Sequence, residues 1–280
     1  MAIKTGLDFI PMNVLILTDL SQVAKNAAEF ALQFLRNTPV KFYLLNIGQF
    51  HTEEDPQLPV SERMARALLK IDLRILELKK LTTNPDHQFE ALYSENDLVT
   101  ATRRYTDAKK IDLIVMGAAN KGFSPYTIVG NQTYEILQKI KCNLLAVAEG
   151  SEFRKIEKLI FPYTYIPSLD ETIRKLENFS AFEKNVEINV MEIFGQTNEE
   201  EILPTGADTM VATNNTSRIK HLKMRDLEIF SISQLQKIQD DFDLIALMGK
   251  DITLCYKLLH NKYGIFSTIS GKLPIFILHD

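Results

Sequence analysis

The sequence predicts an α/β protein built from two tandem domains, each with a parallel five-stranded sheet. Its 280 residues suit two domains at about 150 residues each. Short β-rich runs alternate with longer helical runs, which is typical of βαβ units. The spacing of the segments that close the first half recurs in the second half. We therefore expect domains at residues 12–150 and 155–280.

The first half contains five predicted strands and four predicted helices. Apolar runs predict strands at 14–18, 42–47, 89–93, 113–116 and 144–147. Apolar residues three and four positions apart predict helices at 21–35, 61–81, 97–109 and 131–140. Ser61 is the expected N-cap of the second helix. The buried stripe of that helix is expected to consist of Met64, Leu68, Ile71, Ile75 and Leu78.

A similar series begins in the second half. It starts with a strand at 159–162, continues with a helix from Ser168, and reaches a strand at 186–193. Glu171 completes a capping-box pattern with Ser168.

The closing segments of the two halves have equal spacing. The stretch that begins at Asp112 ends with the strand at Val147, 35 residues later, and the stretch that begins at Asp243 ends at Leu278, also 35 residues later. Duplication of a domain leaves such equal spacing. The rhythm of the elements predicts a Rossmann-like unit with the flavodoxin-like strand order 3-2-1-4-5 in each half.

Charge and cysteine content exclude several classes of protein. Residues 1–150 hold 17 basic and 17 acidic side chains and the remainder holds 15 and 19, so the net charge of −4 lies in the second half. Neither half offers the basic stripe that nucleic acid requires. Cys142 and Cys255 have no CxxC or His pair near them, which argues against disulfides and zinc. No apolar run approaches the roughly 20 residues that span a bilayer, so we expect a cytoplasmic protein without a membrane partner.

Candidate ligand-binding residues follow the first and fourth strands. In the order 3-2-1-4-5 the strand order reverses between these two strands, and ligands bind beyond their carboxyl ends. Thr18, Asp19 and Leu20 stand at the end of the first strand and just after it. Met116 ends the fourth strand, and Gly117 and the residues up to Asn120 follow it. The Asp19 carboxylate suits a ribose or a magnesium ion; the alternative is that it accepts backbone N–H groups at the start of a helix.

A second glycine comes directly before a predicted helix. Gly130 lets the chain enter this helix with the N–H groups of Asn131, Gln132 and Thr133 pointing outward, an arrangement suited to phosphate. Thr133 also suits the orientation of a metal-bound phosphate. The alternative reading makes Gly130 a loop glycine and Asn131 an N-cap.

These residues resemble the universal stress protein family, with the two halves as a tandem pair. The resemblance rests on VLILTDLSQVAKNAAEFAL, FYLLNI, DLIVMGAANKG and IVGNQTYEILQKIKCNLLAV, which cover nearly all of residues 13–148. Over 157–280 it rests on the order and spacing of the elements, on DLIALMG and on the final strand. It implies a stress-response regulator.

Family members that carry the motif G-x2-G-x9-G-S/T bind ATP. Gly117 and Gly130 match its first and third glycines, whereas Asn120 stands at the second glycine and Asn131 at the Ser/Thr position. The match of other positions is also implied: Thr18 and Asp19 correspond to the family's Thr-Asp, and Ile47 to the apolar position near the adenine. The implied cofactor is ATP, with or without Mg²⁺.

Two functions remain open. The first is binding of ATP or a related adenine nucleotide in the first domain, with at most slow hydrolysis, because no general base or P-loop is present. The second is a nucleotide-free interaction module, in which Asn120 and Asn131 have abolished binding. The second domain has no such site, since Pro162 and Tyr163 end its first strand without a following Asp.

The last strand of each predicted sheet is an apolar edge. Residues 144–147 (LLAV) and 275–278 (IFIL) would pair with each other and give an internal pseudo-dimer. The alternatives are cover by helices or loops, and a homodimer of two chains.

Overall fold

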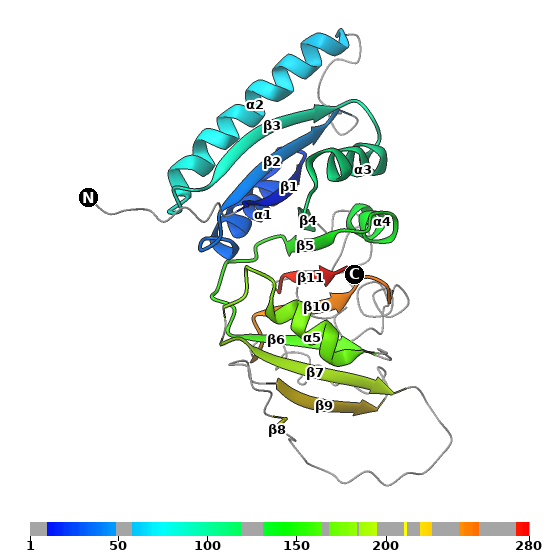
Figure 1. Ribbon diagram of the computed structural model, residues 1–280. Helices are drawn as coiled ribbons and strands as arrows, with labels where there is room; N and C mark the ends of the chain where they lie inside the picture. Colours follow the sequence, from blue (N-terminus) through cyan, green and yellow to red (C-terminus); the bar gives the residue numbers. More distant parts are fainter. Residues whose placement is uncertain are drawn as a thin grey trace, which may run out of the picture.

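The computed structural model describes most of the chain as one continuous sheet flanked by helices. The described residues are 10–48, 58–118, 131–163, 168–183, 185–194, 210–211, 219–225, 241–251 and 273–279. The sheet has 11 strands in the order β3-β2-β1-β4-β5-β11-β10-β6-β7-β9-β8 (Figure 1). In the described part of the chain, no helix is long and apolar enough to cross a membrane.

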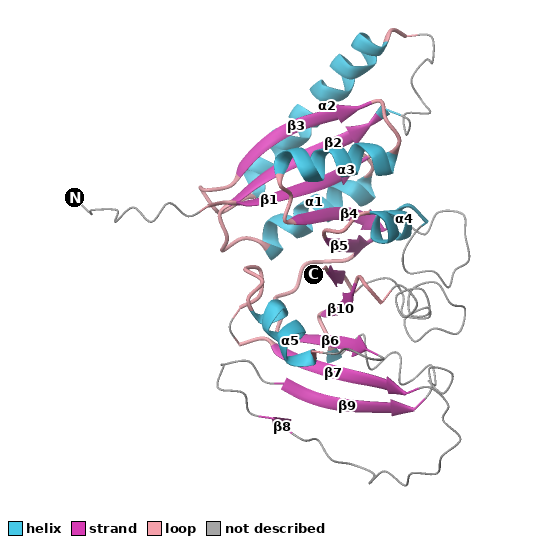
Figure 2. Cartoon of the chain, turned by 45° about the vertical axis from the view of Figure 1, so that its right-hand side comes forward, coloured by secondary structure: helices cyan, strands magenta, loops and turns pink. Residues whose placement is uncertain are grey.

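The N-terminal half forms a parallel five-stranded sheet in the predicted order 3-2-1-4-5. Its strands are β1 (Met12–Thr18), β2 (Val40–Ile47), β3 (Gln88–Ser94), β4 (Leu113–Ala118) and β5 (Asn143–Ala148). Its helices are α1 (Gln22–Phe34), α2 (Val60–Leu81), α3 (Leu98–Lys109) and α4 (Asn131–Lys139). Figure 2 shows α1 and α2 on one side of the strands and α3 on the other.

The C-terminal half has the same strand order. Its elements are β6 (Lys158–Tyr163), α5 (Leu169–Glu177), β7 (Glu187–Phe194), β8 (Met210–Val211), β9 (Ile219–Arg225), β10 (Leu244–Met248) and β11 (Ile275–Leu278). Read outward from β11, the order β11-β10-β6-β7-β9 is again 5-4-1-2-3, and these strands are mutually parallel. The short β8 adds an antiparallel strand beside β9. The equal spacing in the sequence therefore corresponds to equal positions in the sheet, whereas the domain limits 12–150 and 155–280 remain our proposal.

An antiparallel pairing of β5 with β11 joins the two halves, as the apolar edges predicted. Ala146 lies opposite Ile275, Leu145 opposite Phe276 and Leu144 opposite Ile277. The side chains at this junction are buried. Because the pairing is antiparallel, the carboxyl end of β5 lies beside the amino end of β11.

Each face of the sheet carries one hydrophobic cluster, and both clusters cross the junction. Successive residues of β1 alternate between the clusters, as the two-residue repeat of a strand requires. One cluster contains the buried residues of α3 and α4, and the other contains those of α1, α2 and α5. On the second face, the Phe276 ring of β11 lies 4.7 Å from Phe179 and 5.5 Å from Phe182, centroid to centroid.

Three details of the predicted helices are wrong. Pro59 is the N-cap of α2, so Ser61 lies within the helix. Ser168 precedes α5 as predicted, but its side chain accepts no capping hydrogen bond, and Glu171 instead pairs with Lys175 at 3.5 Å, one turn further along the helix. Met64 is 42% exposed rather than buried, because α2 extends past the strands at this end.

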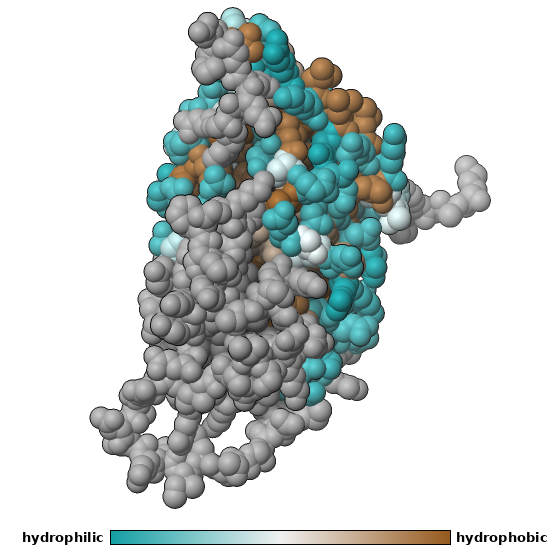
Figure 3. Space-filling model, turned by 180° about the vertical axis from the view of Figure 1, so that it is seen from behind, coloured by the Kyte–Doolittle hydropathy of each residue, from teal (hydrophilic) through white to brown (hydrophobic). Residues whose placement is uncertain are grey.

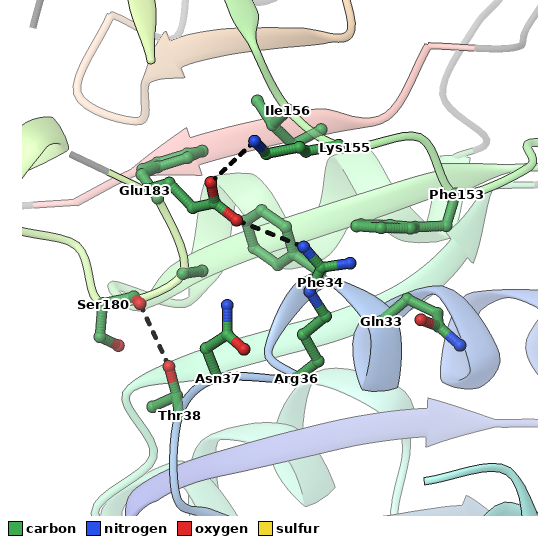
Figure 4. A pocket seen from close by; sticks show the side chains of 12 residues that line it. Gln33, Phe34, Arg36, Asn37, Thr38, Phe153, Lys155, Ile156, Ser180 and Glu183 are labelled. Carbon is green, nitrogen blue, oxygen red and sulfur yellow. Dashed lines mark hydrogen bonds and ion pairs between the residues drawn. The ribbon is translucent and has the colours of Figure 1, made fainter. Parts of the chain in front are cut away.

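A second set of contacts links the halves beside the junction (Figure 4). Glu183 lies between two cations, with Lys155 Nζ at 3.1 Å and Arg36 Nη2 at 3.3 Å. Thr38 donates its hydroxyl to the carbonyl oxygen of Ser180 at 3.1 Å. These residues line a cavity of about 240 Å³ between the end of α1 and the segment that follows α5. Hydrogen bonding to Lys155 and then to Arg36 lowers the pKa of Glu183.

We expect Glu183→Gln to weaken the link between the halves slightly. A carboxylate that is 39% exposed contributes at most about 1 kcal/mol through such pairs. Because its pKa is lowered in the folded protein, this contribution is present above the ordinary pKa of Glu and is lost as the pH falls through the lowered value. Urea unfolding at neutral and at acidic pH measures the difference from wild type.

The matched control is Glu171→Gln, which removes an exposed carboxylate whose ion pair with Lys175 lies within α5. Equal changes in the free energy of unfolding for Glu183→Gln and Glu171→Gln at neutral pH would show that the ion pairs of Glu183 do not stabilise the link between the halves. The same conclusion would follow if the destabilisation by Glu183→Gln persisted in acid.

Candidate functional site

The strand order of the N-terminal half reverses between β1 and β4, as predicted. These strands pair in parallel, with Leu17 opposite Met116, so the next residues, Thr18 and Gly117, are neighbours at the carboxyl edge. On the other side of β1, Thr18 lies opposite Asn46 of β2. Ile47 follows and is buried, with 3% of its surface exposed. The structure thus brings together the predicted residues from β1, β2 and β4.

The turn between β1 and α1 is fixed by three side-chain acceptors. The Thr18 hydroxyl accepts the N–H of Leu20 at 3.0 Å, and the Asp19 carboxylate accepts the N–H of Ser21 at 2.9 Å. The Ser21 hydroxyl caps α1 by accepting the N–H of Ala24 at 3.2 Å. Leu20 has φ of +64°, a left-handed conformation that is uncommon for a residue with a side chain.

Asp19 therefore has the helix-start role that the sequence left open, and it is also exposed. Only one of its oxygens is engaged by Ser21 in this contact. An ionised carboxylate has about four lone-pair sites, so this hydrogen bond is compatible with a second role toward a ligand.

Asn46 is a site residue that the sequence analysis missed. It is fully buried at the end of β2, and its side-chain N–H donates to the carbonyl oxygen of Thr18 at 2.8 Å. This bond ties the carboxyl ends of β1 and β2 together. The signal in the sequence was a single amide within the otherwise apolar strand FYLLNI.

Gly117 has a packing role that the sequence did not reveal. A Cβ at this position would lie 2.7 Å from Val23 Cγ1 and 3.0 Å from the backbone carbonyl group of Val23. The first turn of α1 therefore lies directly on the end of β4. The missing side chain admits this helix, whether or not a ligand also approaches.

The phosphate side of the predicted site is described only in part. Asn120 and Gly130 lie outside the described residues, and α4 begins at Asn131. Within its first turn Gln132 is exposed, whereas Thr133 is buried, with 1% of its surface exposed.

A polar cluster at the ends of α2 and β3 borders the same carboxyl edge. Arg63, in the first turn of α2, bonds the Glu95 carboxylate, with Nη2 to Oε2 at 3.1 Å. The Tyr93 hydroxyl donates to the other oxygen of Glu95. Burial, followed by this hydrogen bond, raises the pKa of Tyr93 to about 12. Gly48, directly after β2, leaves room for the Tyr93 hydroxyl.

The C-terminal half arranges its corresponding edge differently. The ring of His279, directly after β11, occupies the space where a side chain at Gly249 would lie. In the sequence, Thr164 rather than an Asp follows the end of β6 at Tyr163. The stretch between Asp251 and Leu273, which joins β10 to β11, lies outside the described residues.

A cavity of about 760 Å³ lies at the amino ends of the N-terminal strands, away from the predicted nucleotide residues. It is lined by Met12, Pro39, Asp112 and Asn143, among others, together with His279. Cys142 lines it too; burial raises the pKa of this thiol to about 12, so it is an inert residue rather than a nucleophile.

Comparison with known proteins identifies the family. The model of the universal stress protein family matches residues 12–148. Residues 12–148 therefore form a universal stress protein domain, as the sequence resemblance predicted. No curated protein matches the chain.

Solved structures extend the similarity of fold to the whole chain. A universal stress protein from Archaeoglobus fulgidus covers 95% of this chain and 96% of its own, with a TM-score of 0.60 and 12% identity. A candidate universal stress protein from Pseudomonas aeruginosa covers 96% of this chain and 93% of its own, with a TM-score of 0.50 and 11% identity. A universal stress protein in complex with cAMP covers 40% of this chain and 75% of its own, with a TM-score of 0.28 and 18% identity. The first two likenesses show that the fold of both halves recurs in other proteins.

We expect Gly117→Ala to destabilise the protein by about 1–3 kcal/mol, because the added methyl group forces the first turn of α1 away from β4. Urea unfolding followed by circular dichroism measures this cost; the chain has no tryptophan to serve as a fluorescent probe. In a Val23→Ala background the cost falls but does not vanish, since the contact with the backbone of residue 23 remains. A neutral Gly117→Ala substitution would show that helix packing does not require the glycine.

Proposed function

We propose that this protein is a stress-response regulator that binds ATP or a related adenine nucleotide at the carboxyl edge of its N-terminal half. The universal stress protein domain at residues 12–148 and the reversal of strand order between β1 and β4 support this function. The proposed site comprises the turn after β1, the ends of β2 and β4, and the first turn of α4.

The turn at Leu20 carries the proposal. A side chain held at φ of +64° costs on the order of 1 kcal/mol, and such strain tends to persist where surrounding contacts fix a functional geometry. Here the hydroxyl of Thr18 and the carboxylate of Asp19 accept backbone N–H groups of the turn, and the side chain of Asn46 donates to the carbonyl oxygen of Thr18. The result is an exposed carboxylate in a fixed place beside the end of β4, where it suits a ribose hydroxyl.

The first turn of α4 supplies the phosphate contacts in this proposal. The first four N–H groups of a helix have no acceptor within the helix, and the helix dipole favours an anion there. Because Thr133 is almost inaccessible, we assign phosphate to backbone N–H groups and to Gln132 rather than to the Thr133 hydroxyl.

Magnesium fits this site only as a companion of the nucleotide. Among the described residues, no group of three His, Cys, Asp or Glu side chains could hold a metal ion. Mg²⁺ is ordinarily bound through one or two carboxylates together with substrate phosphates. Asp19 is the carboxylate in position for that role.

We expect wild-type protein to bind ATP with a Kd in the micromolar range, where 1 μM corresponds to about −8 kcal/mol. Asp19→Ala and Asp19→Asn should each weaken binding about tenfold or more, because a charged acceptor bonds a hydroxyl more strongly than a neutral one. Isothermal titration calorimetry measures the affinities, and mass spectrometry of freshly denatured protein identifies any copurified nucleotide.

The two substitutions separate the two roles of the carboxylate. Asp19→Asn keeps an oxygen that can accept the N–H of Ser21, whereas Asp19→Ala removes it. If Asp19→Asn binds like wild type and Asp19→Ala does not, the carboxylate serves the turn alone. Wild-type protein that neither copurifies with nucleotide nor binds ATP would instead be an interaction module that retains the fold.

A further inference from the structure

Helix α2 has a second apolar face that points away from the sheet. The face against the sheet consists of Ala67, Ile71, Ile75 and Leu78, which are buried. Three leucines on the opposite side are largely exposed: Leu69 at 63%, Leu73 at 55% and Leu76 at 54%. Figure 3 shows hydrophobic residues gathered along the upper edge of the molecule, where α2 lies.

The exposed face follows the spacing of a coiled coil. We call this face the α2 seam; it consists of Glu62, Arg66, Leu69, Leu73, Leu76 and Lys80, all of which are exposed. Successive residues of the seam are separated by four, three, four, three and four positions, which is the alternation of d and a positions in a heptad repeat.

We propose that the α2 seam is a self-association surface, on which the α2 helix of a second copy of this chain packs in the antiparallel direction. In an antiparallel pair each a position faces a d position of the other helix. A twofold axis midway along the seam then places Leu69 opposite Leu73 of the other copy, and Glu62 opposite Lys80. The leucines form the centre of the contact, and an ion pair between Glu62 and Lys80 forms at each of its two ends.

The charges select this orientation. A parallel pair would place Glu62 against Glu62, Arg66 against Arg66 and Lys80 against Lys80, which is repulsive in all three layers. In the antiparallel pair the aliphatic part of Arg66 covers Leu76 of the other copy. Arg66 keeps its bond to Glu62, whose Oε1 lies 2.6 Å from Arg66 Nη2.

The position of α2 makes the seam available to a second chain. The β5–β11 junction already uses the strand edges that would otherwise pair between chains. Helix α2 instead packs against β3, at the far end of the order from that junction. Mixed charges on the seam also argue against an anionic membrane as its partner. A single helix of 22 residues, about 33 Å long, gives a small interface and hence a weak dimer.

Sedimentation velocity of the full chain over a range of concentrations tests the proposal. Wild type should show a monomer–dimer equilibrium in the micromolar range. Leu69→Gln with Leu73→Gln should raise the dimer Kd by at least about tenfold, because it removes the central layers. Leu81→Gln is the matched control, since Leu81 is also exposed, at 48%, but lies off the seam. A wild type that stays monomeric up to about 1 mM, or a dimer that the double substitution does not weaken, overturns the proposal.

Charge reversal tests the antiparallel direction. Glu62→Lys and Lys80→Glu should each weaken the dimer, by up to about tenfold, since a dimer contains two such pairs. The combined variant restores opposite charges and should recover most of the affinity. Circular dichroism confirms that each variant is folded. A combined variant that dimerises no better than the single variants overturns the antiparallel arrangement.

Discussion

The antiparallel pairing of β5 with β11 is the contact on which the rest of the architecture depends. Each strand alone would be an exposed apolar edge, and such edges promote uncontrolled association. Their pairing joins two sheets of the same order into one and lets both hydrophobic clusters run across the junction. The same pairing brings the end of the N-terminal sheet against the end of the C-terminal one.

Either packing or ligand binding could account for the residue types found at the carboxyl ends of β1 and β4. Gly117 is explained by the close approach of Val23, and Asp19 contributes to the turn before α1. Neither role excludes a ligand, because the strained turn at Leu20 leaves an exposed carboxylate in a fixed place. The same residues thus serve the fold and the proposed site. Only substitutions that separate these roles can assign the binding energy.

Side-chain patterns predicted the elements better than the ends of the helices. Apolar periodicity places α2 correctly, but Pro59 rather than Ser61 caps it, because the local path of the chain decides which residue is last outside the helix. The pattern also contains leucines on two sides of α2. The predicted stripe correctly contains the buried Ile71, Ile75 and Leu78, whereas its first member, Met64, is exposed.

The sequence by itself determined the α/β class, the strand order and the pairing of the two apolar edges, because these follow from local periodicity and from the repeat. It also placed Thr18 and Asp19 near Gly117, since parallel strands bring their carboxyl ends to one edge, and the family resemblance added Ile47. Tertiary structure alone decided the bond from Asn46 to Thr18 and the contact that requires a glycine at position 117. These depend on distances between segments far apart in the chain, which no local pattern encodes.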